Sequence, residues 1–317
     1  MPLKGDILHP MLHLIETQQF DRDSLKKLFA LATEMEDRRD ESLRGKILAT
    51  LFFEPSTRTR FSFESAMMRL GGNVISMENA GESSSSTKGE TLEDTIRIVD
   101  NYADAIAIRH PEAGASERAA AVSEVSIINA GDGAGQHPTQ ALLDLYTIER
   151  EVGGADGIKI AFVGDLKYGR AARSLAYLLA KYDDVHITFV SAPQLRVKDD
   201  LKEYLSGKGV SFDETEELAP SMRESDVVYQ TRIQKERFPS EEEYSHFTGK
   251  YVIDRSLADS MKEKAILIHP LPRAGEIAAE VDDSPHAVYF RQAGYGVLVR
   301  MALLAALLDP KHQGIIG

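Results

Sequence analysis

Short apolar runs alternate with segments of helical periodicity along most of this chain. The expected elements of the first half are, in order, helix 23–38, strand 46–53, helix 56–70, strand 73–76, helix 90–102, strand 105–109, helix 115–122, strand 125–129 and helix 139–150. Strands separated by helices of this length form right-handed βαβ units. The alternation therefore predicts an α/β fold in which parallel sheets are flanked by helices.

A second series of the same kind follows a Gly-rich acidic stretch at residues 151–157. Its expected elements are strand 158–164, helix 170–181, strands 185–190, 226–230 and 265–269, and a final apolar helix at 291–308. A helix that is apolar on most sides must be covered, and we expect the first domain to cover it. The 317 residues are enough for about two domains. We predict one domain of residues 1–150 plus the returning C-terminal helix 292–317, and a second of residues 151–291.

Charge and cysteine content exclude several classes of function. The chain has 37 Lys and Arg against 50 Asp and Glu, a net charge of −13, and no cysteine. An acidic surface repels the phosphates of nucleic acid and of anionic lipid, and the missing thiols exclude disulfides and cysteine-based catalysis or metal sites. No apolar signal segment follows Met1, and the apolar run at 301–308 is shorter than the ~18 residues that span a bilayer. We expect a cytoplasmic protein that binds neither nucleic acid nor membrane.

The segment after the first strand is typical of a phosphate site. Ser56-Thr57-Arg58-Thr59 opens a helix, where free backbone N–H groups and the helix dipole attract anions. Three hydroxyls and a guanidinium add side-chain donors. A helix cap explains one hydroxyl but not four polar residues in succession, so we favour phosphate binding. The Gly-x-x-x-x-Gly-Lys pattern is absent, so the segment is not a Walker A loop.

A second polar segment, residues 129–140, also lies between a strand and a helix. Its glycines run Gly-x-Gly-x-Gly without the acidic residue that a dinucleotide site requires, so we reject that interpretation. His137 and Gln140 lie three apart at the start of a helix and can face one pocket. There His137 could donate a hydrogen bond to a developing oxyanion. Taken alone, the motif equally suits a structural histidine that caps its own loop.

Further candidate residues follow other strands. Arg109 ends strand 105–109, and Arg170 follows strand 158–164. Arg232 and Gln234 point the same way if their segment is extended, and with a second arginine they could bind a dicarboxylate. The two prolines of His269-Pro270-Leu271-Pro272 hold the backbone rigidly, allow a cis peptide bond, and present carbonyls that can accept from an amino group.

One low-complexity loop, residues 81–90, contains four consecutive serines and Lys88. A flexible surface linker is the favoured interpretation of such a loop by itself. A lysine at the end of a hydroxyl-rich loop, just ahead of a helix, also suits an oxyanion ligand.

Together these motifs resemble the aspartate/ornithine carbamoyltransferase superfamily. Residues 56–60 resemble its carbamoyl-phosphate motif, and His137-Pro138-Thr139-Gln140 resembles its second signature. Four more segments match the aspartate branch in order, namely residues 88–90, 165–170, 231–237 and 269–273. The resemblance extends from the first helix to Gly294, essentially the whole chain.

The resemblance implies transfer of the carbamoyl group from carbamoyl phosphate to the amino group of L-aspartate, the committed step of pyrimidine biosynthesis, with no metal and no cofactor. Residues 1–150 would bind carbamoyl phosphate and residues 151–291 aspartate. The implied carbamoyl-phosphate contacts are Ser56, Thr57, Arg58, Thr59, Ser84, Lys88, Arg109, His137, Gln140, Pro270 and Leu271. The implied aspartate contacts are Lys88, Arg170, Arg232, Gln234 and Leu271. The implied catalytic residues are Arg58, Thr59, Lys88, Arg109 and His137.

The same resemblance implies a homotrimer with shared active sites. In this family a lysine and a serine of one loop reach the neighbouring subunit's site, and here they correspond to Lys88 and, by spacing, Ser84. Thr87 stands where some members carry a lysine. The sequence leaves open whether trimers pair with regulatory or dihydroorotase chains.

Two alternative functions remain to be weighed. An ornithine carbamoyltransferase usually carries His-Cys-Leu-Pro where this chain has His269-Pro270-Leu271-Pro272, and Arg232 and Gln234 suit a carboxylate rather than an ammonium group. A non-catalytic carbamoyltransferase-like binding module predicts losses among the site residues, and Thr87 is the only departure. Both comparisons favour the aspartate enzyme.

Overall fold

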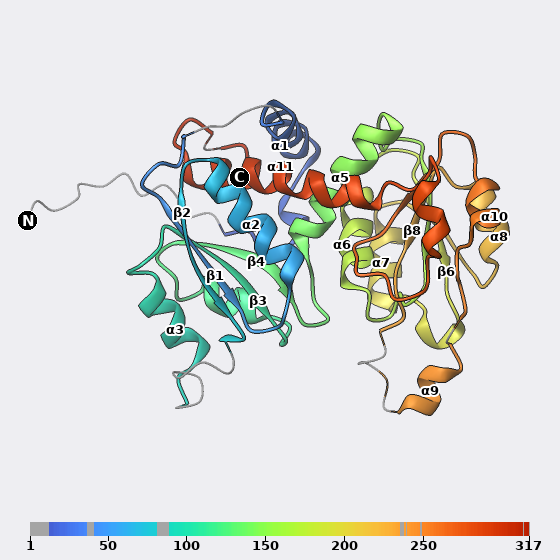
Figure 1. Ribbon diagram of the computed structural model, residues 1–317, viewed down its shortest axis with the longest axis horizontal. Coiled ribbons are helices and arrows are strands. Elements are labelled where there is room, and N and C mark those ends of the chain that lie inside the picture. Colours follow the sequence, from blue (N-terminus) through green and yellow to red (C-terminus); the bar gives the residue numbers. More distant parts are fainter. Residues whose placement is uncertain are drawn as a thin grey trace, which may run out of the picture.

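Two parallel β-sheets, each flanked by helices, lie side by side in the computed structural model (Figure 1). The structure describes residues 13–36, 41–80, 89–234, 238, 240–247, 249–312 and 314–316. The first sheet has the strand order β2-β1-β3-β4, with β1 Ile47–Phe52, β2 Asn73–Glu78, β3 Ala105–His110 and β4 Ser126–Asp132. The strands β1, β3 and β4 are almost wholly buried, which explains the apolar runs within them.

Helices cover both faces of this first sheet. Because strand side chains alternate between faces, Leu48 and Phe52 pack on one side of the sheet while Ala49 and Leu51 pack on the other. The helices of the first lobe are α1 Arg22–Glu34, α2 Thr57–Arg69, α3 Leu92–Val99, α4 Ala115–Ala120 and α5 Pro138–Val152, preceded by the short 3₁₀ helix η1 Thr17–Gln19. The apolar faces of α3 and α4 share one core cluster, and those of α1, α2 and α5 share the other.

The second sheet has the strand order β7-β6-β5-β8-β9. Its strands are β5 Lys159–Val163, β6 His186–Val190, β7 Ser211–Thr215, β8 Val227–Gln230 and β9 Ile266–Ile268. Its helices are α6 Arg170–Leu179, α7 Asp199–Gly207, α8 Leu218–Glu224, α9 Glu241–Ser245 and α10 Arg255–Asp259, with 3₁₀ helices η4 Pro193–Leu195 and η6 Ala279–Asp283. Both sheets are parallel throughout, as the sequence predicted.

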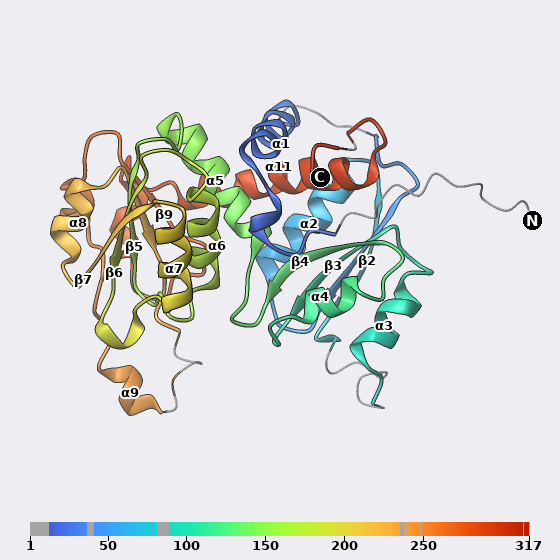
Figure 2. The same cartoon turned by 180° about the vertical axis from the view of Figure 1, so that it is seen from behind.

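The last helix, α11 (Tyr289–Leu308), returns from the second lobe and crosses the first (Figures 1 and 2). It packs against α1, α2 and α5, and its first turns contact β9. By length and composition α11 could cross a membrane, but most of it is buried inside the protein, as in a core helix of a soluble protein. The expectation that the first lobe covers this helix is confirmed.

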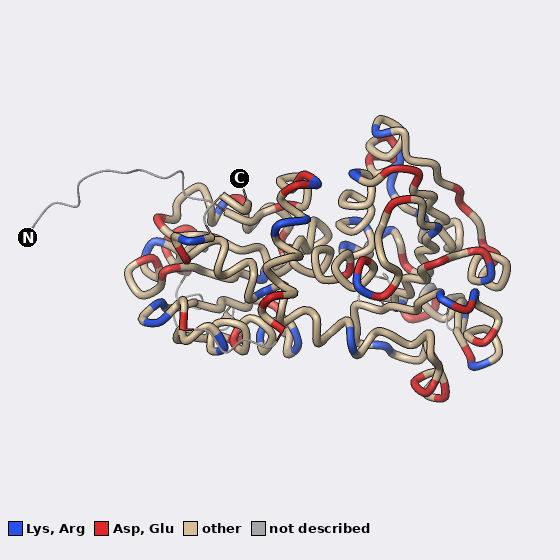
Figure 3. Tube along the Cα trace, turned by 90° about the horizontal axis from the view of Figure 1, so that it is seen from above, with Lys and Arg blue, Asp and Glu red and all other residues tan. Residues whose placement is uncertain are grey.

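Several elements of the second lobe were missing from the sequence prediction. The strand β7 contains one apolar residue, Phe212, and lies at an exposed edge, so no periodicity marked it. The helices α7 to α10 are short and were also not predicted. Acidic and basic residues are intermixed over both lobes, so the acidic excess is spread over the whole molecule (Figure 3).

Candidate active site

A pocket of about 630 Å³ lies between the two sheets. In each sheet the chain reverses its direction of winding at one point, between β1 and β3 in the first and between β5 and β8 in the second. Ligands of open α/β sheets bind outside the carboxyl ends of the strands at such switch points. Much of the lining lies at or soon after the carboxyl ends of β1, β3, β4, β5, β8 and β9, so both switch points open into the pocket.

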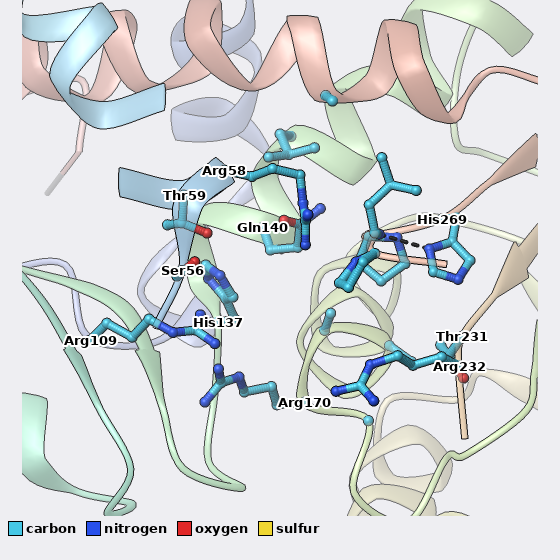
Figure 4. Close-up of a pocket in the computed structure, with 18 of the residues that line it drawn as sticks. Ser56, Arg58, Thr59, Arg109, His137, Gln140, Arg170, Thr231, Arg232 and His269 are labelled. Atoms are coloured by element: carbon cyan, nitrogen blue, oxygen red, sulfur yellow. Dashed lines mark hydrogen bonds between the residues drawn. The ribbon is translucent and has the colours of Figure 1, made fainter. Parts of the chain in front are cut away.

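Twelve of the fourteen predicted site residues line this pocket. They are Ser56, Thr57, Arg58, Thr59, Arg109, His137, Gln140, Arg170, Arg232, Gln234, Pro270 and Leu271. The remaining two, Ser84 and Lys88, lie outside the described residues. Figure 4 shows Ser56, Thr59, Arg109 and His137 on the side of the first lobe and Thr231, Arg232 and His269 on the opposite side.

The first turn of α2 forms one end of the pocket. Ser56 is the N-cap of this helix, yet its hydroxyl makes no capping hydrogen bond, so the first N–H groups and the hydroxyl both remain available to a ligand. Thr59 is buried and Arg58 is exposed. Partial burial and the nearby positive charge of Arg232 lower the pKa of Arg58. This end of the pocket can therefore bind an anion through backbone and side-chain donors together.

Cations outnumber anions among the described residues that line the pocket. Arg109 and Arg170 approach one carboxylate oxygen of Glu54, at 3.5 Å and 3.4 Å. Arg170 also donates to the carbonyl of Gly133 at 2.7 Å. Burial, followed by the charge of Arg170, lowers the pKa of Arg109 to about 9. Crowded guanidinium groups repel one another, and a bound anion offsets this repulsion. The pocket therefore favours anionic ligands.

His137 is a buried neutral histidine at the start of α5. Burial and the charges of Arg170, Arg109 and Arg300 hold its pKa well below the ordinary value. Its backbone N–H donates to the Ser174 hydroxyl on α6, and in the described structure its Nδ1 has no hydrogen-bond partner. A neutral imidazole still has one N–H group to donate, so His137 can donate a hydrogen bond to an oxyanion without adding a positive charge.

The loop after β9 is held by His269. The Nδ1 atom of His269 accepts from the backbone N–H of Leu271 at 2.7 Å, the bond dashed in Figure 4. The proton of His269 therefore lies on Nε2 and is donated to Glu276 at 2.7 Å. The Leu271–Pro272 peptide bond is cis, and Leu271 has a φ of 53°. These contacts fix the backbone of residues 269–272 where it lines the pocket.

Several residues of the pocket were not found by sequence reasoning. Among those with polar side chains are Glu54, Tyr168, Gln292 and Arg300. Glu54 lies two residues before the phosphate motif, and Gln292 and Arg300 are polar exceptions in an apolar helix, which is a signal that could have identified them. The buried Asp144, one helical turn after Gln140, carries the same signal.

Comparison with known proteins identifies the class to which this fold and pocket belong. The family model described as aspartate/ornithine carbamoyltransferase, carbamoyl-P binding domain, matches residues 12–150, and the model of the Asp/Orn binding domain of the same family matches residues 156–307. The chain belongs to the aspartate/ornithine carbamoyltransferase family.

Relatives within the family are named as aspartate enzymes. The chain is 56% identical to aspartate carbamoyltransferase 3, chloroplastic, of Pisum sativum, over 93% of this chain and 77% of that protein. It is 51% identical to the aspartate carbamoyltransferase catalytic subunit of Methanocaldococcus jannaschii, over 94% of this chain and 98% of the relative. The solved catalytic subunit of the M. jannaschii enzyme superimposes with a TM-score of 0.88, covering 96% of this chain and all of that one. The Trypanosoma cruzi enzyme in complex with carbamoyl phosphate and aspartate, 42% identical, gives a TM-score of 0.89 over 93% of this chain and 96% of that one.

Proposed function

We propose that this chain transfers the carbamoyl group of carbamoyl phosphate to the amino group of L-aspartate, giving N-carbamoyl-L-aspartate and phosphate. The observation that carries the proposal is one pocket lined by Arg58, Arg109, Arg170 and Arg232, contributed by both lobes. Such a pocket suits two polyanionic substrates held side by side. The names of the relatives, and the carbamoyl phosphate and aspartate bound to the T. cruzi enzyme, support the same reaction.

In this proposal each end of the pocket binds one substrate. The first turn of α2 and Arg109 bind the phosphate of carbamoyl phosphate. Arg170, Arg232 and Gln234 bind the two carboxylates of aspartate. Gln140 and the backbone carbonyls of Pro270 and Leu271 accept from the carbamoyl NH2 group. Lys88 and Ser84 act in the site of a neighbouring subunit.

The reaction then needs no covalent intermediate with the enzyme. The amine of aspartate attacks the carbamoyl carbon to form a tetrahedral intermediate, and the oxygen that gains charge receives hydrogen bonds from Thr59, Arg109 and His137. Phosphate leaves and takes the amine proton. Catalysis comes from holding two anions together in reactive geometry and from donors placed where the charge develops.

Three further points belong to the proposal. The subunits form a homotrimer, to which regulatory or dihydroorotase chains could attach. The domains divide at about residue 150, with the segment 292–317 belonging to the first. The protein works in the cytoplasm, although the plant relatives are named chloroplastic.

Phosphate release from carbamoyl phosphate, measured with and without L-aspartate, tests the activity. We expect release that depends on aspartate, much slower turnover of glutamate because its extra methylene misplaces the amine, and no turnover of ornithine. Alanine lacks the second carboxylate and leaves guanidinium groups unpaired, so it should be rejected by ~10⁴ or more. A folded sample without aspartate-dependent release would favour the binding module, and carbamoylation of ornithine would favour the other branch.

A further inference from the structure

Asp144 is a buried carboxylate to which the proposed mechanism gives no role. It lies on α5 one turn after Gln140 and has no exposed surface. Its Oδ1 accepts from Gln140 Nε2 at 2.8 Å and from Gln292 Nε2 at 2.5 Å. Its Oδ2 accepts from the Tyr229 hydroxyl at 2.7 Å. Aspartate is seldom buried without partners, and here the donors come from three elements, α5, α11 and β8.

The orientation of the Gln292 amide follows from a backbone donor. The N–H group of His269 donates to Gln292 Oε1 at 2.9 Å. A backbone N–H cannot accept, so the carbonyl end of Gln292 faces His269 and its NH2 end faces Asp144.

The same reasoning orients Gln140. Asp144 Oδ1 accepts hydrogen bonds whether the carboxyl group is ionised or carries its proton on Oδ2, so Gln140 turns its NH2 group toward Asp144 Oδ1. Its other end, the carbonyl oxygen Oε1, is then the end that faces the pocket, which Gln140 lines. A single oxygen atom, Asp144 Oδ1, thus holds the Gln140 amide and, through Gln292, the start of the loop that contains Pro270 and Leu271.

We propose that Asp144 is a positioning residue that gives the carbamoyl NH2 subsite its polarity and so selects carbamoyl phosphate against acyl phosphates without that group. The inference rests on the proposed function, because it requires the NH2 group to lie among Gln140, Pro270 and Leu271. Oxygen acceptors then surround that group. A methyl group in its place satisfies none of them, and sites built to hydrogen-bond an N–H group strongly reject analogues that lack it.

The accepting oxygen, rather than the negative charge, is the essential feature. Asparagine at position 144 keeps Oδ1 for both glutamines and turns its Nδ2 toward Tyr229, whose oxygen can accept. Asp144→Asn is therefore the matched control for Asp144→Ala, which removes both oxygens and leaves the Gln140 amide free to rotate.

Three ligands distinguish orientation from general damage. Carbamoyl phosphate carries the NH2 group, acetyl phosphate has a methyl group in its place, and N-phosphonoacetyl-L-aspartate joins a phosphonate to aspartate but has no such NH2 group. We expect Asp144→Ala to lower kcat/KM for carbamoyl phosphate by ~10–100-fold, the usual cost of losing a residue that orients a ligand-binding side chain. Asp144→Asn should lower it by less than ~5-fold. The Ki of acetyl phosphate and the Kd of the phosphonoacetyl compound should change by less than ~3-fold in both variants.

Three results would overturn the proposal. Asp144→Ala could weaken all three ligands equally, which would indicate a structural role alone. It could leave carbamoyl phosphate unaffected, or Asp144→Asn could be as harmful as Asp144→Ala, which would assign the effect to charge. If Asp144→Ala does not fold, Asp144→Ser, whose hydroxyl is too short to reach both glutamines, takes its place with the same expected ratios.

Failure of the proposed activity is recognised separately. A wild-type protein that binds carbamoyl phosphate but never carbamoylates aspartate would refute the activity. The ratio of the Kd of carbamoyl phosphate to the Kd of acetyl phosphate, compared among the wild type, Asp144→Asn and Asp144→Ala, would still decide the role of Asp144.

Discussion

At the scale of single residues, the described lining of the pocket carries an excess of positive charge that bound anions can balance. The pKa values of Arg109, which is largely buried, and of Arg58, which is only partly covered, are lowered because desolvation and neighbouring guanidinium groups oppose their positive charge. We predict that Arg58→Ala lowers kcat by ~10²-fold or more, because the phosphate loses a bidentate donor. The free energy of unfolding should change by less than about 0.5 kcal/mol, since the side chain is exposed. Steady-state kinetics and urea unfolding check both, with Arg44→Ala, at an exposed arginine that does not line the pocket, as control. Retention of more than about a tenth of the turnover would contradict the phosphate role.

A second prediction at this scale concerns Asp144 and pH. Burial raises its pKa from 3.8 to about 7, against the opposing effects of its three hydrogen-bond donors and of Arg300. As pH rises from about 4 to about 7 the unfolded chain releases this proton while the folded protein retains it, so the wild type loses stability over that window. A rise of this size corresponds to at most about 4 kcal/mol. Asp144→Asn has no carboxyl group to titrate at this position. The free energy of unfolding of Asp144→Asn minus that of the wild type should therefore increase over the same pH window and then level off. Urea unfolding of both proteins at about pH 5 and about pH 8 measures this, and a constant difference would show that Asp144 is not buried as a carboxylate.

At the scale of elements, the two central strands of the second sheet approach each other closely just before the site. Gly164 follows β5 with a φ of +112°, and a Cβ atom there would lie 2.4 Å from the carbonyl oxygen of Thr231, which follows β8. We predict that Gly164→Ala lowers the free energy of unfolding by more than about 1 kcal/mol. Because Thr231 must move, Arg232 moves with it, and KM for aspartate should rise more than KM for carbamoyl phosphate. Gly207→Ala is the control, since a Cβ at Gly207 meets no atom within 4 Å. An equal rise in KM for both substrates would contradict this prediction, because the ends of β5 and β8 would then not act on the aspartate-binding end of the pocket alone.

At the scale of the whole molecule, the proposed trimer predicts complementation between inactive chains. If Lys88 acts in the neighbouring subunit's site, a mixture of Lys88→Ala and Arg58→Ala chains contains interfaces at which one site has both residues intact. Dissociation and reassembly of the mixture should then restore part of the activity. Each variant treated alone is the control, and sedimentation or light scattering verifies that mixed oligomers form. Mixed oligomers that remain inactive would place Lys88 in its own subunit's site or outside any site.

Much of this protein could be predicted from its sequence, because local patterns decide where strands and helices begin and end. The apolar runs of β1, β3 and β4 and the polar residues directly after them placed Ser56 to Thr59, Arg109 and His137 at one edge of a parallel sheet, and there the structure has them. The prediction was weakest where the local signal was weak, as in the exposed edge strand β7 and the short helices around it.

Only the tertiary structure decided which polar side chains became buried and what they contact. Asp144 receives hydrogen bonds from Tyr229, 85 residues away, and from Gln292, 148 residues away, and Glu54 meets Arg170, 116 residues away. Sequence periodicity extends over a turn or a strand and carries no information about such pairs. The desolvation that raises the pKa of Asp144, and the crowding of guanidinium groups that lowers the pKa of Arg109, exist only when packing removes water and brings distant segments together.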